Sequence, residues 1–235
     1  MNPTHRKKYL RIQILICATA CLALISCNGS EKLGDPPTYR DAIPTTAPDE
    51  NLDLAKAGQA TGYRKAVEQF AEACDSTAKA LPKVDGGYAM LVSHDDAPKL
   101  VEKHHNAYLK KGYTVFRIAN NFGIDGNPDA LAILPTSNKF NVIRAVGTSA
   151  PKHDITNSDI INWLRRLEQT YPLDLTGAGS SWIECKLTTR LLDPDTLARK
   201  VYKFCPDVVD DGAGSIEVLA EQIKSTQTLY LWWNR

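Results

Sequence analysis

The chain has 235 residues, of which 43% are hydrophobic and 23% are charged, so a core can form and disorder is excluded as the default interpretation. The formal net charge of +1 at pH 7 falls to −3 once residues 1–26, which carry four Lys/Arg and no Asp/Glu, are taken away. That balance has no basic excess to attract nucleic acid, and we expect no nucleic acid partner.

The N-terminal segment is typical of a bacterial lipoprotein signal peptide. Basic residues between His5 and Arg11 precede an apolar run over 12–25, which is shorter than the roughly 20 residues that a membrane-spanning helix needs. The run ends in the sequence LISC, residues 24–27, which resembles the lipobox of bacterial lipoproteins, where the cysteine is lipidated. We therefore predict that residues 1–26 form the signal peptide and that Cys27 is lipidated.

The lipid on Cys27 defines the expected location. Each buried CH₂ group of an acyl chain contributes about 0.8 kcal/mol, and several chains hold a protein on a bilayer almost permanently. Asn28 after the cysteine, rather than aspartate, resembles the outer-membrane sorting signal of enterobacterial lipoproteins. We predict a bacterial envelope protein on the periplasmic side of the outer membrane, with the membrane as its partner through this lipid.

Three further cysteines remain in the mature chain: Cys74, Cys185 and Cys205. An odd number allows one disulfide at most in an oxidising envelope compartment, which excludes a disulfide scaffold. Whether two of the three pair stays open.

The mature chain begins with a polar segment. Residues 27–50 are rich in Pro, Thr, Asp and Gly and show no apolar period, so we predict a flexible tether there and one globular domain over 51–235. A helical stretch is expected over 52–80. The next expected elements are a strand over 88–93, a helix over 97–111, strands over 113–119 and 130–134, and a short helix over 140–146.

The second half of the domain carries clear start signals. TNSD at 156–159 has the form of a capping box before an amphipathic helix, and SWIECKL alternates as a half-buried strand does. Asp193 and Pro194 are expected to start another helix. A further helix is expected to contain Leu219, and LYLWW is expected to form the last strand. Hairpin-like neighbours beside helical crossovers predict the α+β class: a single domain with a mixed sheet of about five strands flanked by helices.

Three carboxylates, Asp207, Asp210 and Asp211, cluster in one short stretch. With Asp207 as the first ligand of an EF-hand loop, valine occupies the twelfth position, where an acid should chelate. We therefore predict no metal and no other cofactor, and we interpret 207–214 as a turn between helices, with a positive φ at Gly212.

Phosphate and thiol chemistry are weaker interpretations. The sequence GAGS at 212–215 opens a helix, but the two preceding aspartates would repel a phosphate. The second GAGS, at 177–180, precedes a strand and is expected to be a turn. Cys185 and Cys205 are interpreted as core residues, since Cys205 closes a helix, where the negative potential raises the pKa of a thiol.

The C-terminal half resembles a known family. KFCPDVVDDG at 203–212, the terminal LYLWWNR and the upstream VGTSAPKHDITNSDIINWL resemble the bacterial domain of unknown function catalogued as DUF family 4253, over about 141–235. The family has no established activity, so the resemblance implies no mechanism. Its pattern singles out Thr148, Phe204, Cys205, Pro206, Asp207, Asp210, Gly212, Trp232 and Trp233, as a fold signature or a site.

Two functions stay open. The absence of G-x-S-x-G and H-E-x-x-H and the tryptophan-rich C-terminus favour a non-enzymatic binding or interaction domain for an envelope protein or glycan. The alternative is a hydrolase or metal-dependent enzyme that acts on an envelope substrate through clustered carboxylates. The candidate binding residues are Thr148, Trp182, Glu184, Asp207, Asp210, Asp211, Trp232 and Trp233.

Overall fold

A computed structural model of the chain describes residues 53–234. The described residues form two compact units: 53–191 together with 227–234 make the larger unit, and Leu192–Thr226 make the smaller one. No helix within 53–234 is long and apolar enough to cross a membrane. The predicted signal peptide, the lipidation of Cys27 and the tether over 27–50 lie outside the described residues.

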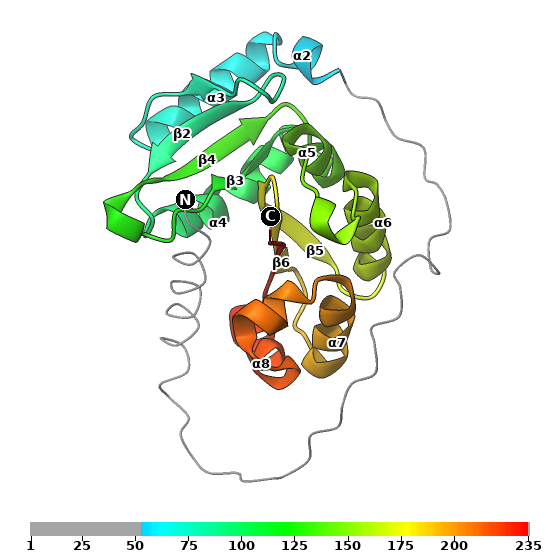
Figure 1. The fold of residues 1–235 in the computed structure, drawn as a ribbon. Helices are drawn as coiled ribbons and strands as arrows, with labels where there is room; N and C mark the ends of the chain where they lie inside the picture. The colour runs from blue at the N-terminus through cyan, green and yellow to red at the C-terminus, as the bar shows by residue number, and fades with distance from the viewer. Residues whose placement is uncertain (1–52, 235) are drawn as a thin grey trace, which may run out of the picture. The chain divides into compact units, whose positions relative to one another are not determined.

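The larger unit alternates helices and strands (Figure 1). Its helices are α2 (Leu54–Ala57), α3 (Thr61–Ala73), α4 (Ala97–Leu109), α5 (Lys139–Val146), α6 (Asn157–Glu168) and the short 3₁₀ turns η2 (Ile124–Gly126) and η3 (Pro151–His153). Its strands are β1 (Lys79–Ala80), β2 (Tyr88–Val92), β3 (Thr114–Ala119), β4 (Asp129–Leu134), β5 (Leu173–Gly179), β6 (Trp182–Leu187) and β7 (Thr228–Trp232).

The strands form one mixed sheet in the order β1-β2-β4-β3-β5-β6-β7. Every neighbouring pair is antiparallel except β3 and β5, which run parallel and share the single ladder pair Arg117 with Gly177. The predicted α+β class with a mixed sheet flanked by helices is confirmed, with seven strands rather than about five.

Two local predictions were wrong. The helical stretch expected over 52–80 divides into α2, α3 and the two-residue strand β1. The sequence GAGS at 177–180 is not a turn over its whole length, because Gly177 and Gly179 lie inside β5 and only the residues after Gly179 turn the chain into β6. Glycine is unfavourable within a strand unless another group approaches the backbone closely, and that group is described below.

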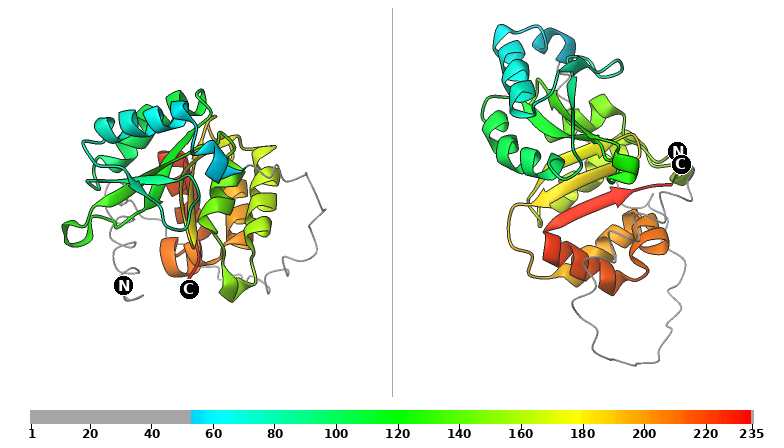
Figure 2. Two further views of the ribbon diagram at one scale, coloured as in Figure 1. Left: turned by 90° about the horizontal axis from the view of Figure 1, so that it is seen from above. Right: turned by 90° about the vertical axis from the view of Figure 1, so that its left-hand side faces the viewer.

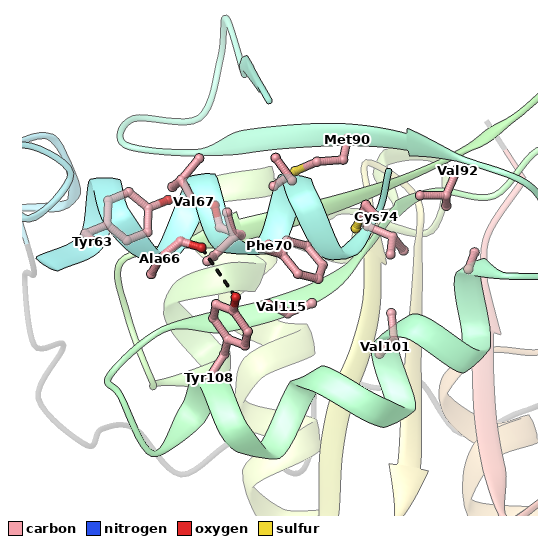
Figure 3. Packing of buried hydrophobic residues seen from close by; sticks show 14 residues of the cluster. Tyr63, Ala66, Val67, Phe70, Cys74, Met90, Val92, Val101, Tyr108 and Val115 are labelled. Carbon is pink, nitrogen blue, oxygen red and sulfur yellow. Dashed lines mark hydrogen bonds between the residues drawn. The ribbon is translucent and has the colours of Figure 1, made fainter. Parts of the chain in front are cut away.

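One face of the sheet is covered by α3 and α4, whose apolar side chains meet those of β2, β3 and β4 (Figure 3). The ring of Phe70 on α3 meets the ring of Tyr108 on α4 edge-on, with centroids 5.4 Å apart. The hydroxyl of Tyr108 donates to the carbonyl of Ala66 at 3.4 Å, which ties the two helices together. Burial of each large side chain of this kind stabilises the fold by about 1.5–3 kcal/mol.

The opposite face of the sheet is covered by α5 and α6, which lie side by side (Figures 1 and 2). The predicted capping box at the start of α6 is confirmed: the Asp159 N–H donates to Thr156 Oγ1 at 3.3 Å, and the Thr156 N–H donates to Asp159 Oδ2 at 2.8 Å. The side-chain amide of Asn157 donates to the carbonyls of Ile143 and Thr148, so the start of α6 is fixed to the end of α5.

The smaller unit consists of α7 (Pro194–Phe204), a π-helical turn η4 (Val209–Ala213) and α8 (Ile216–Thr226), with α7 and α8 in contact (Figure 1). The predicted start of α7 is confirmed, because Asp193 Oδ1 accepts from the Thr196 N–H at 3.0 Å and Pro194 is the first helical residue. Ser215 Oγ accepts from the Val218 N–H at 3.3 Å, as expected of a residue that caps α8.

The turn between α7 and α8 contains a left-handed glycine, but at a different position from the predicted one. The positive φ of 84° belongs to Gly214, and Gly212 has none. The expectation for Gly212 failed because η4 keeps the chain helical as far as Ala213, so that the reversal falls at its C-terminal end.

We expect Gly214→Ala to lower the free energy of unfolding by about 1–2 kcal/mol, because an L side chain opposes the left-handed conformation. A Cβ at Gly214 meets nothing within 4 Å, so steric contact adds nothing to this cost. Gly214→Asn should cost clearly less, since asparagine tolerates that conformation. Urea denaturation of both variants measures the difference, and equal losses would contradict a backbone origin.

Candidate functional site

The candidate site lies at one edge of the sheet of the larger unit. The pairing makes β2, β3, β5 and β7 run in one direction, so their C-terminal ends share this edge with the starts of β4 and β6. His94 follows β2, Phe122 follows β3, Asp129 starts β4 and Trp182 starts β6. In open α/β sheets, ligands bind beyond the carboxyl ends of parallel strands, and β3 and β5 are the parallel pair of this sheet.

Asp129 is the buried centre of a polar network. Its side chain has no exposed surface, and its carboxylate accepts three hydrogen bonds. The Asn121 N–H donates to Oδ1 at 2.7 Å, while His94 Nδ1 and Arg117 Nη1 lie 3.1 Å and 3.4 Å from Oδ2. A carboxylate can only accept, so His94 carries its hydrogen on Nδ1. These donors replace the water that a buried carboxylate has lost.

Arg117 joins Asp129 to a second carboxylate. Its Nη2 is paired with Glu184 Oε2, and the other oxygen of Glu184, Oε1, accepts from the Thr176 hydroxyl at 2.9 Å. The planar guanidinium presents several donors at fixed angles, which suits one arginine between two acids. The guanidinium and the two carboxylates together carry a charge of −1, and the network holds Glu184 on the sheet surface.

Gly177 lies between Arg117 and Glu184 in the sheet, and its lack of a side chain leaves space for their pairing. Arg117 is on β3 and Glu184 on β6, and Gly177 on the intervening strand β5 is the ladder partner of both. A Cβ at Gly177 would lie 2.7 Å from Trp182 Cζ3 and 3.1 Å from Glu184 Cβ. The missing side chain therefore leaves room for the indole of Trp182 and the side chain of Glu184 beside β5.

A row of aromatic rings adjoins this network. The indole of Trp182 covers β5 so closely that a Cβ at Gly179 would lie 2.0 Å from its Nε1. The ring of Tyr230 on β7 stacks on the indole, with centroids 5.6 Å apart and planes at 25°. Phe122 meets Tyr230 edge-on at 6.5 Å. The close approach of this indole explains why two glycines occupy β5.

Other residues of the predicted set fix the hairpin between β5 and β6. The Thr148 hydroxyl donates to the Gly179 carbonyl at 2.8 Å, and the Trp233 N–H donates to the Ser181 carbonyl at 3.0 Å. Thr148 and Trp233 are both buried. Trp232 is half-buried and is the ladder partner of Trp182. Five of the eight predicted residues thus meet around one end of β5, β6 and β7.

Residues 130–234 match the family model Domain of unknown function (DUF4253). This match confirms the resemblance seen in the sequence and begins eleven residues before Asn141. No curated protein and no solved structure matches the chain.

The DUF4253 segment, residues 130–234, supplies only part of the candidate site. Thr176, Trp182, Glu184 and Tyr230 lie inside the segment, whereas His94, Arg117, Phe122 and Asp129 precede it. The network around Arg117 therefore joins residues of the DUF4253 segment to residues outside it.

The three predicted aspartates belong to the smaller unit, although they too lie in the DUF4253 segment. Asp207 is buried, and Asp210 Oδ1 accepts from the Tyr202 hydroxyl at 3.1 Å. Asp211 is half-buried within η4. Among residues 53–234, no three His, Cys, Asp or Glu side chains are grouped so that they could hold a metal ion.

The three cysteines of the described part are free thiols, so none of them forms a disulfide with another. All three are buried, as the interpretation of Cys185 and Cys205 as core residues requires. Burial raises the pKa of the Cys74 thiol to about 11 and raises that of Cys185 further. Both thiols therefore stay protonated at neutral pH, which opposes nucleophilic chemistry.

The sequence interpretation missed His94, Arg117 and Asp129. A usable signal was present in two places, because Arg117 interrupts the apolar run TVFRIA and Asp129 opens the apolar run DALAIL. A charged side chain in a buried strand is rarely found without a partner of opposite charge. That rule would have indicated a pairing of the two residues, though not the additional pairing with Glu184.

Proposed function

We propose that this chain is a lipid-anchored protein of the bacterial cell envelope whose larger unit binds an envelope protein or glycan without transforming it. The binding surface that we assign, called the aromatic face, consists of Phe122, Glu184, Tyr230 and Trp232, and the buried indole of Trp182, which stacks on Tyr230, supports it. The lipid anchor rests on the sequence LISC before residue 28.

The observation that carries the proposal is the arrangement of β6 and β7. Glu184 is the ladder partner of Tyr230, and Trp182 is the ladder partner of Trp232, so one half-buried carboxylate lies among three aromatic side chains on one side of the sheet. Aromatic residues bury large areas at a low cost in conformational entropy, and they dominate binding energies at interfaces. The Arg117 network holds Glu184 in place beneath such a partner.

The geometry favours binding over the hydrolase alternative. Both oxygens of Glu184 are already engaged, by Arg117 and by Thr176, in the way that a positioning network requires. The other carboxylates of that hypothesis, Asp207, Asp210 and Asp211, lie in the smaller unit. The contacts of Glu184 are those of a residue that holds the binding surface in shape, and no proton transfer by Glu184 is needed to explain them.

Replacing Trp232 by alanine should weaken binding at least about tenfold, as expected when a central aromatic side chain is removed from an interface. The measurement uses the chain from residue 28 onward, in pull-downs from envelope extracts and in co-sedimentation with purified peptidoglycan. Tyr202→Ala, which removes a partly exposed tyrosine of the smaller unit, is the control. Equal retention by wild type, W232A and Y202A would overturn the assignment of the aromatic face.

Cys27→Ala should abolish lipidation, because alanine offers no thiol to acylate. Cells fed a radioactive fatty acid should label the wild-type protein but not the variant, and the variant should accumulate as precursor or in the soluble fraction. Fatty acid that still labels the Cys27→Ala chain would contradict the predicted anchor. Separation of inner and outer membranes on a sucrose gradient then tests the predicted outer-membrane location.

A further inference from the structure

A second site lies at the other ends of the central strands. Because β3 and β5 share only the pair Arg117 with Gly177, their N-terminal ends are not held together by further ladder pairs. A pocket of about 170 Å³ is found there, lined by residues of α4, α5 and the starts of both strands. The polar side chains that matter are His105, Ser137, Asn138, Lys139 and Asp174.

His105 contributes a hydrogen-bond acceptor, its Nε2 atom, to this pocket. Only 5% of the residue is exposed, and its Nδ1 lies 2.7 Å from the Val115 carbonyl oxygen. A carbonyl can only accept, so Nδ1 carries the hydrogen, and Nε2 of the neutral ring is an acceptor. Among residues 53–234, none donates a hydrogen bond to Nε2, although the imidazole lines the pocket. An acceptor that is open to the pocket can take a hydrogen bond from a donor on a ligand there.

Asp174 supplies a second hydrogen-bond acceptor and a negative charge to the pocket. Its carboxylate is half-buried in the pocket wall and takes no hydrogen bond from the part of the chain that the structure describes. Lys139, the cation of the same wall, is already neutralised, because its Nζ pairs with Glu168 and donates to the Leu173 carbonyl at 2.5 Å. With its Glu168 partner included, Lys139 leaves the carboxylate of Asp174 as the uncompensated charge at the pocket, and this charge attracts a cation with N–H groups.

We propose that this pocket binds a small molecule through a protonated amino group, which donates to the Asp174 carboxylate and to His105 Nε2. A volume of about 170 Å³ corresponds to roughly six water molecules, so the ligand has only a few carbon atoms. Two sources share this chemistry, a simple alkylamine and a small amino acid. Only the amino acid has a carboxylate that the Asn138 amide and the Ser137 hydroxyl, which also line the pocket, could recognise.

The test compares three compounds of similar size on the chain from residue 28 onward: ethylamine, alanine and propionate. Isothermal titration and thermal melts should detect binding of ethylamine, alanine or both, and no binding of propionate, which lacks the amino group. Alanine alone would identify the amino acid as the source, and ethylamine binding would show that the amino group suffices. Binding of propionate as tight as that of alanine, or no binding of either amine, would overturn the proposal.

Asp174→Asn should weaken the binding at least about tenfold while the unliganded variant still melts cooperatively, since the residue has no partner to lose within 53–234. Asp195→Asn, at an exposed position on α7, is the matched control and should leave the affinity unchanged. In protein labelled with ¹⁵N-histidine, saturation with the amine should also shift the His105 Nε2 signal. Equal affinities of wild type and D174N, or an unmoved His105 signal, would exclude this site.

Discussion

Replacing Asp129 by asparagine is expected to lower the free energy of unfolding by about 3–5 kcal/mol, which is typical of removing one partner from a buried ion pair. The carboxylate of Asp129 is fully buried and accepts hydrogen bonds from Asn121, His94 and Arg117. An amide keeps one acceptor oxygen, and in either orientation its NH₂ group faces at least one of the three donors. Glu184 is then the one carboxylate of this network that still pairs with the Arg117 guanidinium.

Urea denaturation followed by circular dichroism measures this loss, with Asp125→Asn as the control. Asp125 is exposed and lies at φ 54° in the loop just before β4, a conformation that asparagine tolerates well. The control should change the free energy of unfolding by less than about 0.5 kcal/mol. A similarly small loss for D129N would show that the network contributes little to stability.

Truncation to the DUF4253 segment, residues 130–234, should abolish cooperative folding. The segment supplies β4, β5, β6 and β7, yet β3, which pairs with both β4 and β5, lies outside it. Truncation also removes α3 and α4 and exposes the apolar face of β4 that they cover. Strands that lose their neighbour lose both their backbone hydrogen bonds and the burial of one face.

Thermal melts and ¹H–¹⁵N spectra of two chains test this prediction. Residues 53–234 should give dispersed amide signals and a cooperative melt, whereas residues 130–234 should give collapsed signals and no transition. A cooperative melt of the shorter chain would mean that β4 and β5 find another arrangement without β3.

Elements with local start signals could be predicted from the sequence. The capping box at Thr156 and the cap and proline at Asp193 and Pro194 specify α6 and α7 through neighbours within three residues, and alternation specifies β6. β5 could not be predicted in the same way, because Gly177 and Gly179 indicate a turn locally. Their place in a strand depends on Trp182, which belongs to another strand.

The same distinction holds for the candidate site. Alternation in SWIECKL places Trp182 and Glu184 on one side of β6, and this much follows from sequence alone. The meeting of Arg117 with Glu184 depends on a parallel register between β3 and β5 that rests on one ladder pair. Closeness in sequence predicts that Asp207 and Asp210 are neighbours, and the structure places both in the smaller unit, away in sequence from the residues of the Arg117 network.

The close approach of the indole to β5 also constrains how this protein can change over generations. A side chain at position 177 or 179 requires the indole of Trp182 to move, because the new Cβ would lie 2.7 Å or 2.0 Å from the ring. We therefore expect the tryptophan to be replaced by a smaller residue before either glycine gains a side chain. Relatives with a larger residue in β5 are expected to have lost this ring, so the three positions should vary together.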